Sequence, residues 1–335
     1  MKRTLIVFVL FLSACSAGPK TVPLFIYDGN DAYISEFEIK IHQAVGEDFL
    51  IKTYESQNSQ IIQNEQIDQV FKDKHTLLII NPVDRLSVYA IIEKARQNDT
   101  TLIFFNREPL ESDLYSYDKA YYVGADATQS AELQASVIMD LFDNDPKNLN
   151  QLDKNQDGII QTVILKGEQG HQDAEARTKF VIQELNQAGY KIQVLDIVIA
   201  NWDREIAYSL MDGLLEKNGE AMELLISNND AMALGAIERL SEKGFFKDSN
   251  QNGIIDRVNE PWFPVVGIDG ISTAIESIKA GYLYGTVKND SQNMALIIIE
   301  LTKWLLEKRS LEDFPYEIKS GKYVWVNYQK MTLDE

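Results

Sequence analysis

The chain has 335 residues, enough for about two domains of ordinary size. Hydrophobic residues make up 45% and charged residues 25%, which argues against a disordered chain and a polytopic membrane protein. The formal net charge of −19 disfavours binding to the phosphate backbone of nucleic acids. The single cysteine, Cys15, excludes an intramolecular disulfide and zinc sites that need two or more cysteines.

The first fifteen residues predict a lipoprotein signal peptide. Two basic residues precede an uncharged apolar run, residues 4–14, which is too short to span a bilayer. The run ends in Leu-Ser-Ala-Cys, which resembles a bacterial lipobox, in which the cysteine is lipidated and begins the mature chain. We therefore expect a signal peptide at residues 1–14, a lipidated Cys15 and a tether over residues 15–22. The alternative is an ordinary signal peptide with an incidental cysteine.

Beyond the signal peptide, short apolar runs alternate with amphipathic stretches almost to the end of the chain. We expect strands at Leu24–Tyr27, Phe49–Tyr54, Leu77–Asn81, Thr101–Phe105, Ala120–Val123, Thr162–Leu165, Ile192–Ile199, Glu223–Ser227, Phe263–Ile268 and Gly285–Val287. We expect helices at Ala32–Ala44, Arg85–Gln97, Ala127–Leu141, Ala174–Ala188, Arg204–Leu215, Ala231–Lys243, Ser272–Ala280 and Gln292–Glu307. Two series of such βαβ units predict an α/β protein with two doubly wound, Rossmann-like lobes.

Polar and aromatic residues follow most of the expected strands. Open α/β sheets bind ligands at the carboxyl ends of their strands, so these residues are candidates for a site. Carboxylates and amides can exchange hydrogen bonds with hydroxyl groups, an arginine offers several donors, and aromatic rings can cover the apolar faces of a sugar ring. The combination predicts a site for a small, neutral, polyhydroxylated ligand. These strand-end residues are Asp28, Asn30, Asp31 and Tyr33; Asn106, Arg107 and Glu108; Gly167, His171, Asp173 and Arg177; Trp202 and Asp203; Asn228, Asn229 and Asp230; Asp269; and Asn289 and Asp290.

Several long motifs in one order resemble the periplasmic galactose/glucose-binding proteins of bacterial ABC sugar transporters. The motifs are FFNREP (104–109), SYDKAYYVGAD (116–126), LKGEQGHQDAEART (165–178), SNNDAMALGA (227–236), VVGIDG (265–270) and GTVKND (285–290). The resemblance implies the type I periplasmic-binding-protein fold, with a three-segment hinge near Val123–Asp126, Asn289–Ser291 and Val324–Asn327. It implies an N-terminal lobe of residues 23–124 plus 290–325 and a C-terminal lobe of residues 125–289 plus 326–335.

The same resemblance implies ten sugar ligands among these residues, which are Asp31, Tyr33, Asn106, His171, Asp173, Arg177, Trp202, Asn229, Asp269 and Asn289. Tyr33, where the family has Phe, and Trp202 would sandwich a pyranose ring, and the other eight would bind its hydroxyl groups. Asp173 could instead cap the helix expected at Ala174, or do both. Asp230 and Asp290 fit helix caps better than sugar ligands.

The segment Asp153–Gln161 follows the first nine positions of an EF-hand loop. Oxygen donors fall at Asp153, Asn155, Asp157 and Gln161, with the carbonyl of Ile159 at position 7. Position 12 carries no Glu, and the family resemblance implies that the distant Glu223 replaces it. The sequence thus predicts a calcium site, against the alternative of a solvated turn. A second segment, Asp248–Asp256, has the same spacing with fewer carboxylates, and both a second calcium site and an Asx turn stay open there.

These observations predict a non-enzymatic receptor outside the cytoplasm, lipid-anchored at the periplasmic face or outer surface. It would capture D-galactose or D-glucose as a calcium-stabilised monomer and deliver the sugar to an ABC transporter permease; whether a chemoreceptor also reads the closed form stays open. The alternatives are a receptor for another monosaccharide, such as a pentose, and a secreted glycosidase that uses Asp173 and Asp269. A sugar-responsive transcription repressor would share the lobes, but a signal peptide stands where its DNA-binding helices would be.

Overall fold

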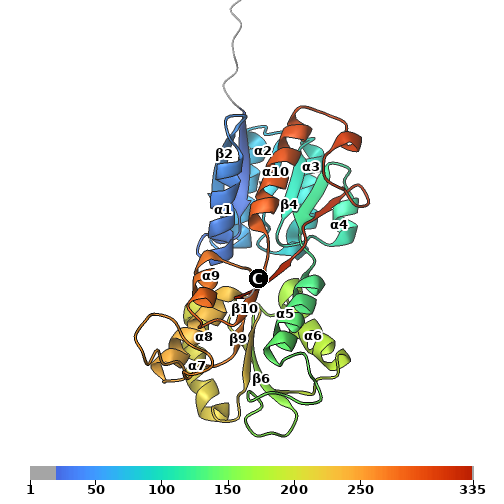
Figure 1. Ribbon diagram of the computed structural model, residues 1–335. Helices are drawn as coiled ribbons and strands as arrows, with labels where there is room; N and C mark the ends of the chain where they lie inside the picture. Colours follow the sequence, from blue (N-terminus) through green and yellow to red (C-terminus); the bar gives the residue numbers. More distant parts are fainter. Residues whose placement is uncertain (1–19, 334–335) are drawn as a thin grey trace, which may run out of the picture.

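A six-stranded parallel sheet forms the centre of the first lobe in the computed structural model, which describes residues 20–333 (Figure 1). The strand order is β11-β5-β4-β3-β1-β2. The inner strands β3 and β4 are almost entirely apolar and buried, as expected for a sheet whose two faces are both covered by helices. The strands are β1 (Thr21–Ile26), β2 (Leu50–Glu55), β3 (Leu77–Ile80), β4 (Thr101–Phe105), β5 (Ala120–Gly124) and β11 (Tyr323–Trp325).

The second lobe is built around a sheet of the same size, in the order β12-β10-β9-β8-β6-β7. Five strands are parallel, and the edge strand β12 runs antiparallel to β10. The strands are β6 (Ile160–Lys166), β7 (Ile192–Ile199), β8 (Leu224–Ser227), β9 (Val265–Val266), β10 (Gly285–Lys288) and β12 (Gln329–Thr332). The expectation of two doubly wound lobes is confirmed.

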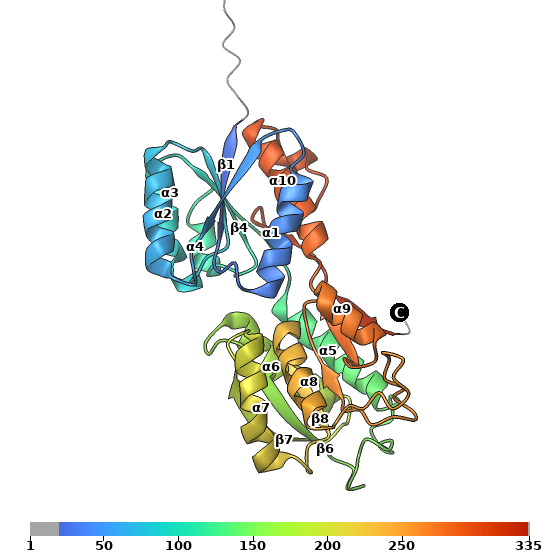
Figure 2. The same cartoon turned by 90° about the vertical axis from the view of Figure 1, so that its left-hand side faces the viewer.

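Helices cover both faces of each sheet (Figure 2). In the first lobe, α1 (Ala32–Ala44) and α10 (Ser291–Leu306) lie on one face, and α2 (Gln60–Lys72), α3 (Val88–Gln97) and α4 (Glu111–Tyr115) on the other. In the second lobe, α7 (Arg204–Asn218), α8 (Asp230–Glu242) and α9 (Ser272–Lys279) oppose α5 (Ala127–Leu141) and α6 (Gln172–Gln187). Two 3₁₀ turns, η1 (Arg85–Ser87) and η2 (Leu311–Asp313), complete the described elements.

The chain passes between the lobes three times, at residues 125–126, 289–290 and 326–328. The first two crossings each lead from a strand of one lobe into a helix of the other, and the third links β11 to β12. Neither lobe is therefore continuous in sequence. Because the carboxyl ends of the strands in both lobes face these crossings, the residues that follow the strands meet between the lobes.

The largest differences from the expected elements are in polar or short segments. Helix α2 was not expected because its sequence is rich in Gln and Asn, and only four of its residues are buried, among them Gln63 and Ile67. The tail was expected only as a crossing, whereas it adds β11 to one sheet and β12 to the other. Helix α6 begins at Gln172, two residues before the expected start.

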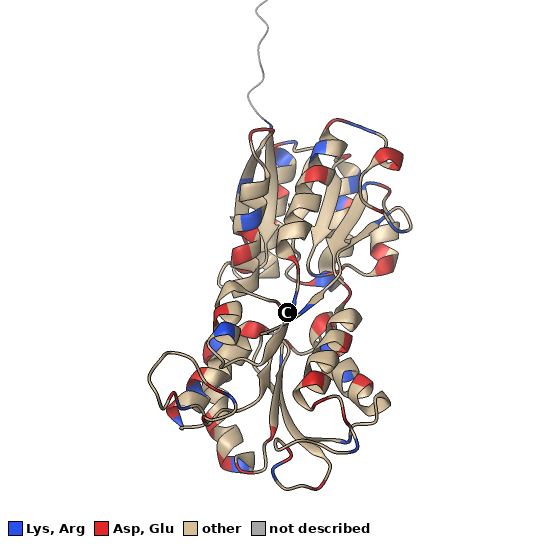
Figure 3. Ribbon diagram, viewed as in Figure 1, with Lys and Arg blue, Asp and Glu red and all other residues tan. Residues whose placement is uncertain are grey.

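Charged side chains of both signs are interspersed over the helices of both lobes (Figure 3). Arg239 on α8, for example, pairs with Asp212 on α7 and with Glu242. The negative charge of the described part is therefore distributed over its surface. Among residues 20–333, no helix combines the length and apolar character needed to cross a bilayer. Cys15 and the expected signal peptide lie outside the described residues.

Candidate functional site

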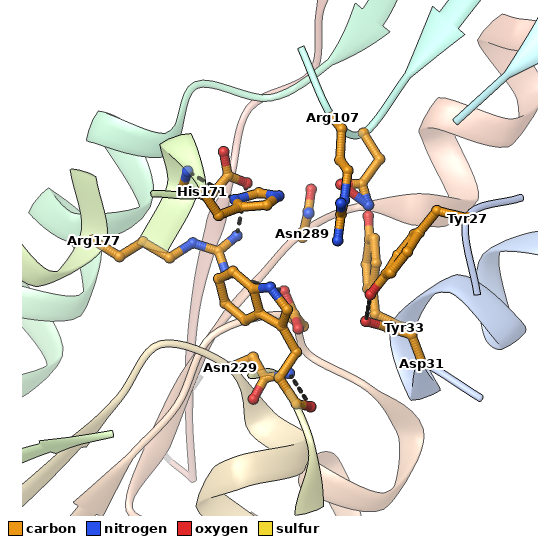
Figure 4. Close-up of a pocket in the computed structure, with 12 residues that line it drawn as sticks. Tyr27, Asp31, Tyr33, Arg107, His171, Arg177, Asn229 and Asn289 are labelled. Atoms are coloured by element: carbon orange, nitrogen blue, oxygen red, sulfur yellow. Dashed lines mark hydrogen bonds and ion pairs between the residues drawn. The ribbon is translucent and has the colours of Figure 1, made fainter. Parts of the chain in front are cut away.

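A single pocket between the lobes brings together all ten residues that the sequence predicts as ligand-binding (Figure 4). They come from the ends of strands in both lobes and from the hinge. The pocket is also lined by Tyr27 and Arg107, which are not among the ten residues that the family resemblance implies. Its lining is Tyr27, Asp31, Tyr33, Asn106, Arg107, His171, Asp173, Arg177, Trp202, Asn229, Asp269 and Asn289.

Three of these residues also cap the helices that begin at the pocket. Oδ1 of Asp31 accepts from the backbone N–H of Ile34, and Oδ1 of Asn229 accepts from that of Met232, both at 3.0 Å. His171 Nδ1 accepts from the backbone N–H of Asp173 at 3.1 Å. The N-termini of α1, α6 and α8 are thereby aimed at the pocket, where their dipoles favour oxygen-rich ligands.

Two expectations about helix caps were wrong. His171, not Asp173, caps α6, because the helix begins earlier than the apolar pattern indicated. Asn229, not Asp230, caps α8. Asp230 is instead fully buried and accepts hydrogen bonds from the N–H of Gly270 and the hydroxyl of Thr286, at 2.7 and 2.6 Å, so it holds the loop after β9 in place. Asp290 caps α10 as expected.

Arg177 is a buried cation at the base of the pocket, with 3% of its surface exposed. Nη1 donates to the carbonyl of Asn228 at 2.7 Å, and Nη2 donates to the hydroxyl of Tyr328 in the third crossing at 3.1 Å. The carboxylates of Asp173 and Asp269 each lie 3.6 Å from the guanidinium. These partners compensate the cost of burying the charge and fix the direction in which the guanidinium faces.

Trp202 provides the aromatic wall in the second lobe. Its ring lies against the backbone of Gly167, where a Cβ would stand 2.3 Å from two ring atoms. The imidazole of His171 contacts the ring edge-on, with centroids 5.2 Å apart. Only glycine therefore leaves room for the indole at this place, and the ring is held in one orientation.

Three pocket residues have backbones in the positive-φ region, which costs energy for any residue with a Cβ. Asn106 has φ 60°, Trp202 φ 67° and Asp269 φ 128°, and each lies within three residues of the end of a strand. Such conformations persist only where the surroundings enforce them, and they are concentrated at functional sites. Apart from Asn106, of a residue type that tolerates this region, the sequence carried no signal for them.

Burial shifts the protonation of several pocket groups. It raises the pKa of Asp269 well above its usual range, against the opposing charge of Arg177, and it raises the pKa of Asp31, against hydrogen bonds from Tyr27 and Ile34. Burial lowers the pKa of His171 to about 4, so its ring is neutral near pH 7. Because Nδ1 accepts the N–H of Asp173, the proton belongs on Nε2, which leaves a donor.

Neither Tyr27 nor Arg107 is among the ten residues that the family resemblance implies, although Arg107 was noted at the end of a strand. Tyr27 follows an apolar strand and resembles part of its core, yet its hydroxyl donates to Asp31. Arg107 stands next to Asn106; its guanidinium lies 3.8 Å from the centroid of the Tyr27 ring and donates to Glu168 of the other lobe at 3.2 Å. The signal that could have found Arg107 was its place in the strand-end segment Asn-Arg-Glu.

Further polar contacts join the lobes at the rim of the pocket. Gln172 on α6 donates to Glu108 at 2.7 Å. Glu36 on α1 accepts from both the N–H and the hydroxyl of Ser272, at 2.9 and 2.6 Å, and so caps α9 from the opposite lobe. A larger hollow adjoins the pocket and shares Tyr27 and Trp202 with its lining.

The expected calcium loop is closed by hydrogen bonds to its own carboxylates and to Glu223. Asp153 and Asp157 accept backbone N–H groups within the loop, and the carboxylate of Glu223 reaches it from the start of β8, accepting from the N–H of Lys154 and Gln161 at 2.6 and 3.2 Å. The carboxamide oxygen of Gln161 is buried and has no hydrogen-bond partner. Such an oxygen fits a cation ligand.

No three His, Cys, Asp or Glu side chains within residues 20–333 converge into a metal site by themselves. The expected ligand set also uses Asn155, Gln161 and the carbonyl of Ile159. Calcium at this loop therefore stays a prediction. The second segment forms the same network, with Asp248 accepting from Gly253 at 2.7 Å and Glu260 accepting from Ser249 at 2.8 Å; the expected Asx turns are present there.

The fold and the pocket define a class of protein, a two-lobed α/β binding protein that encloses a small polar ligand at its hinge. Residues 22–310 match the family model described as periplasmic binding protein domain. The chain is 34% identical over 330 residues to the D-galactose/methyl-galactoside binding periplasmic protein MglB of Haemophilus influenzae, covering 95% of this chain and 94% of that protein. It is 22% identical to the ribose import binding protein RbsB of Bacillus subtilis, covering 77% and 72%.

Solved structures show the same fold. An ABC transporter solute binding protein from Bacillus halodurans with bound myo-inositol superimposes with a TM-score of 0.75 at 22% identity, covering 95% of this chain and 96% of that one. One from Actinobacillus succinogenes with bound D-allose gives 0.74 at 18% identity, covering 94% and 98%. The chain belongs to the periplasmic binding protein family, and thus to binding components of transporters rather than to enzymes.

The close approach of Trp202 to Gly167 generates a prediction. In the variant Gly167→Ala the new methyl group displaces the indole, and the affinity for the ligand falls by about 10-fold or more, while the lobes still fold. Calorimetric titration measures the affinity, and circular dichroism checks the fold. Gly213→Ala, on the open surface of α7, is the matched control and leaves the affinity unchanged. Unaltered binding by Gly167→Ala would contradict the tight placement of the ring.

Proposed function

We propose that this chain is the receptor of an ABC sugar transporter and that it binds D-galactose and D-glucose. The observation that carries the proposal is the composition of the pocket. Its charges largely offset one another, with Asp31, Asp173 and Asp269 against Arg107 and Arg177. A neutral ligand with many hydroxyl groups can satisfy such a lining, whereas a charged ligand would unbalance it.

The choice of hexose rests on the relative that binds galactoside, which covers nearly the whole chain. In our proposal, Trp202 and Tyr33 cover the two faces of the ring, and the polar residues bind its hydroxyl groups. The contacts across the rim, such as Glu36 with Ser272, stabilise the closed lobes, and a permease recognises this closed form. Binding proteins for other polyols share the fold, so the identity of the sugar is the part most in need of a test.

Isothermal titration of the purified protein with monosaccharides tests the ligand. We expect saturable one-to-one binding of D-galactose and D-glucose. We expect much weaker binding of D-ribose, because a pentose leaves buried polar groups of the pocket unpaired. The proposal fails if neither hexose binds, or if myo-inositol or D-ribose binds more tightly than both.

We also propose that calcium stabilises the second lobe at the loop Asp153–Gln161, completed by Glu223. Bound there, the cation would neutralise the loop carboxylates and join the loop to β8. At calcium concentrations well above the dissociation constant, its removal should lower the melting temperature by roughly 5 °C or more.

A thermal melt with and without a chelator measures this shift. In Asp153→Asn the shift should largely disappear, because the loop loses a ligand charge. In the matched variant Asp248→Asn, in the second loop, the shift should remain. A melting temperature that does not respond to the chelator would contradict the site, and loss of the shift in Asp248→Asn alone would move it to the other loop.

Finally, we propose that Cys15 carries the lipid that holds the protein at the membrane. The proposal rests on the sequence Leu-Ser-Ala-Cys after the apolar run. In cells fed radiolabelled palmitate, the wild-type protein should incorporate label, and the Cys15→Ser variant should incorporate none. Equal labelling of both would refute the anchor.

A further inference from the structure

Three polar atoms that belong to the pocket are buried without a hydrogen-bond partner. They are the hydroxyl of Tyr33, Nε of Arg177 and Oδ1 of Asn289. Buried polar atoms are almost always paired, and an unpaired one costs free energy. Two donors and one acceptor on the walls of one pocket are a pattern that the hydroxyl groups of a ligand can complete.

The Tyr33 hydroxyl is unlike the other tyrosine hydroxyls at the site. Tyr27 donates to Asp31, and the hydroxyl of Tyr328 receives a hydrogen bond from Arg177. Tyr33 has 6% of its surface exposed, and its oxygen contacts no partner among the described residues. The hydroxyl of this pocket residue is therefore a polar group that still lacks a hydrogen-bond partner.

The position of Tyr33 is fixed by packing. Tyr33 lies in the first turn of α1, two residues after the cap Asp31, and its ring packs edge-to-face with Phe37, with centroids 5.8 Å apart. Phe37 in turn packs on Phe105 at the end of β4. A side chain held in this way can present its hydroxyl in one direction without losing further rotamer freedom on binding.

The hydroxyl keeps its proton under ordinary conditions. Burial raises the pKa of Tyr33 well above its usual range, and the negative charge of Asp269 raises it further. The charged groups that act on it, Asp269, Arg177 and Asp290, belong to the second lobe and the hinge. Figure 4 shows Tyr33 beside Asp31 on the side of the first lobe, across the pocket from Arg177 of the second lobe.

We propose that the hydroxyl of Tyr33 is a specificity-determining donor, which hydrogen-bonds one particular hydroxyl group of the sugar in the closed protein. The inference rests on the proposed sugar-binding function and adds a polar role to the ring of Tyr33. A sugar that lacks the matching hydroxyl leaves the phenol unpaired and binds more weakly. The site then selects among monosaccharides partly through this one group.

The test combines the variant Tyr33→Phe with monodeoxy derivatives of D-galactose and D-glucose, measured by calorimetric titration. The variant keeps the ring and removes only the oxygen. We expect its affinity for the parent hexose to fall by about 10-fold. We expect one deoxy sugar, and only one, to bind the wild type and the variant equally well. This sugar lacks the hydroxyl group that Tyr33 would bind, so removal of the phenol oxygen costs it no hydrogen bond.

The matched control is Tyr190→Phe. Tyr190 is also a buried tyrosine whose hydroxyl has no partner, but it lies in the core of the second lobe, away from the pocket. Its variant should bind every sugar as the wild type does, so a general effect of removing a phenol oxygen would be detected. Thermal melts of both variants show whether each is folded.

The possible outcomes distinguish a failure of this inference from a failure of the proposed sugar-binding function. If the wild type binds a hexose and Tyr33→Phe binds it as tightly or more tightly, the inference is overturned and the receptor function stands. If the variant weakens all deoxy sugars by the same factor, Tyr33 acts through shape alone, and the inference is overturned as well. If the wild type binds neither hexose, the proposed function and the inference fall together.

Discussion

The buried positive charge of Arg177 is the constraint around which the site is arranged. A guanidinium removed from water must be paired and hydrogen-bonded on several sides. Its partners come from four separate segments: Asp173 from its own helix, Asn228 after β8, Asp269 after β9 and Tyr328 in the third crossing. Holding this one charge therefore ties strand ends of the second lobe to the hinge, and it leaves Nε unpaired in the pocket.

Several pocket residues also cap the N-termini of helices. Asp31, His171 and Asn229 each satisfy a free N–H at the start of a helix while lining the pocket. The side chains that would meet a ligand are thereby fixed before it arrives, which reduces the entropy lost on binding. Contacts across the rim, including the cap that Glu36 gives to α9, join the two lobes beside the pocket.

The sequence pattern predicted the lobes, and the family resemblance selected ten of the pocket residues from those that follow the strands. Alternating short apolar strands and amphipathic helices predict parallel sheets, and parallel sheets collect the residues after their strands at one edge. Tyr27 was not predicted as a pocket residue because an aromatic residue at the end of an apolar strand is typical of the hydrophobic core. Helix α2 was not predicted because the polar residue Gln63 interrupts the apolar pattern on its buried face. Gln63 is buried, and its amide donates a hydrogen bond to Ser56. The positive φ angles of Trp202 and Asp269 depend on tertiary contacts that no local pattern carries.

The most direct test of the account is a crystal structure of the protein grown with D-galactose. The account predicts one sugar in the pocket, with its C–H face on Trp202 and its hydroxyl groups within hydrogen-bonding distance of Arg177 and Asp269. A sugar bound instead in the outer hollow beside Asp28 and Arg204, or a structure in which saturating galactose leaves the pocket without sugar, would contradict it.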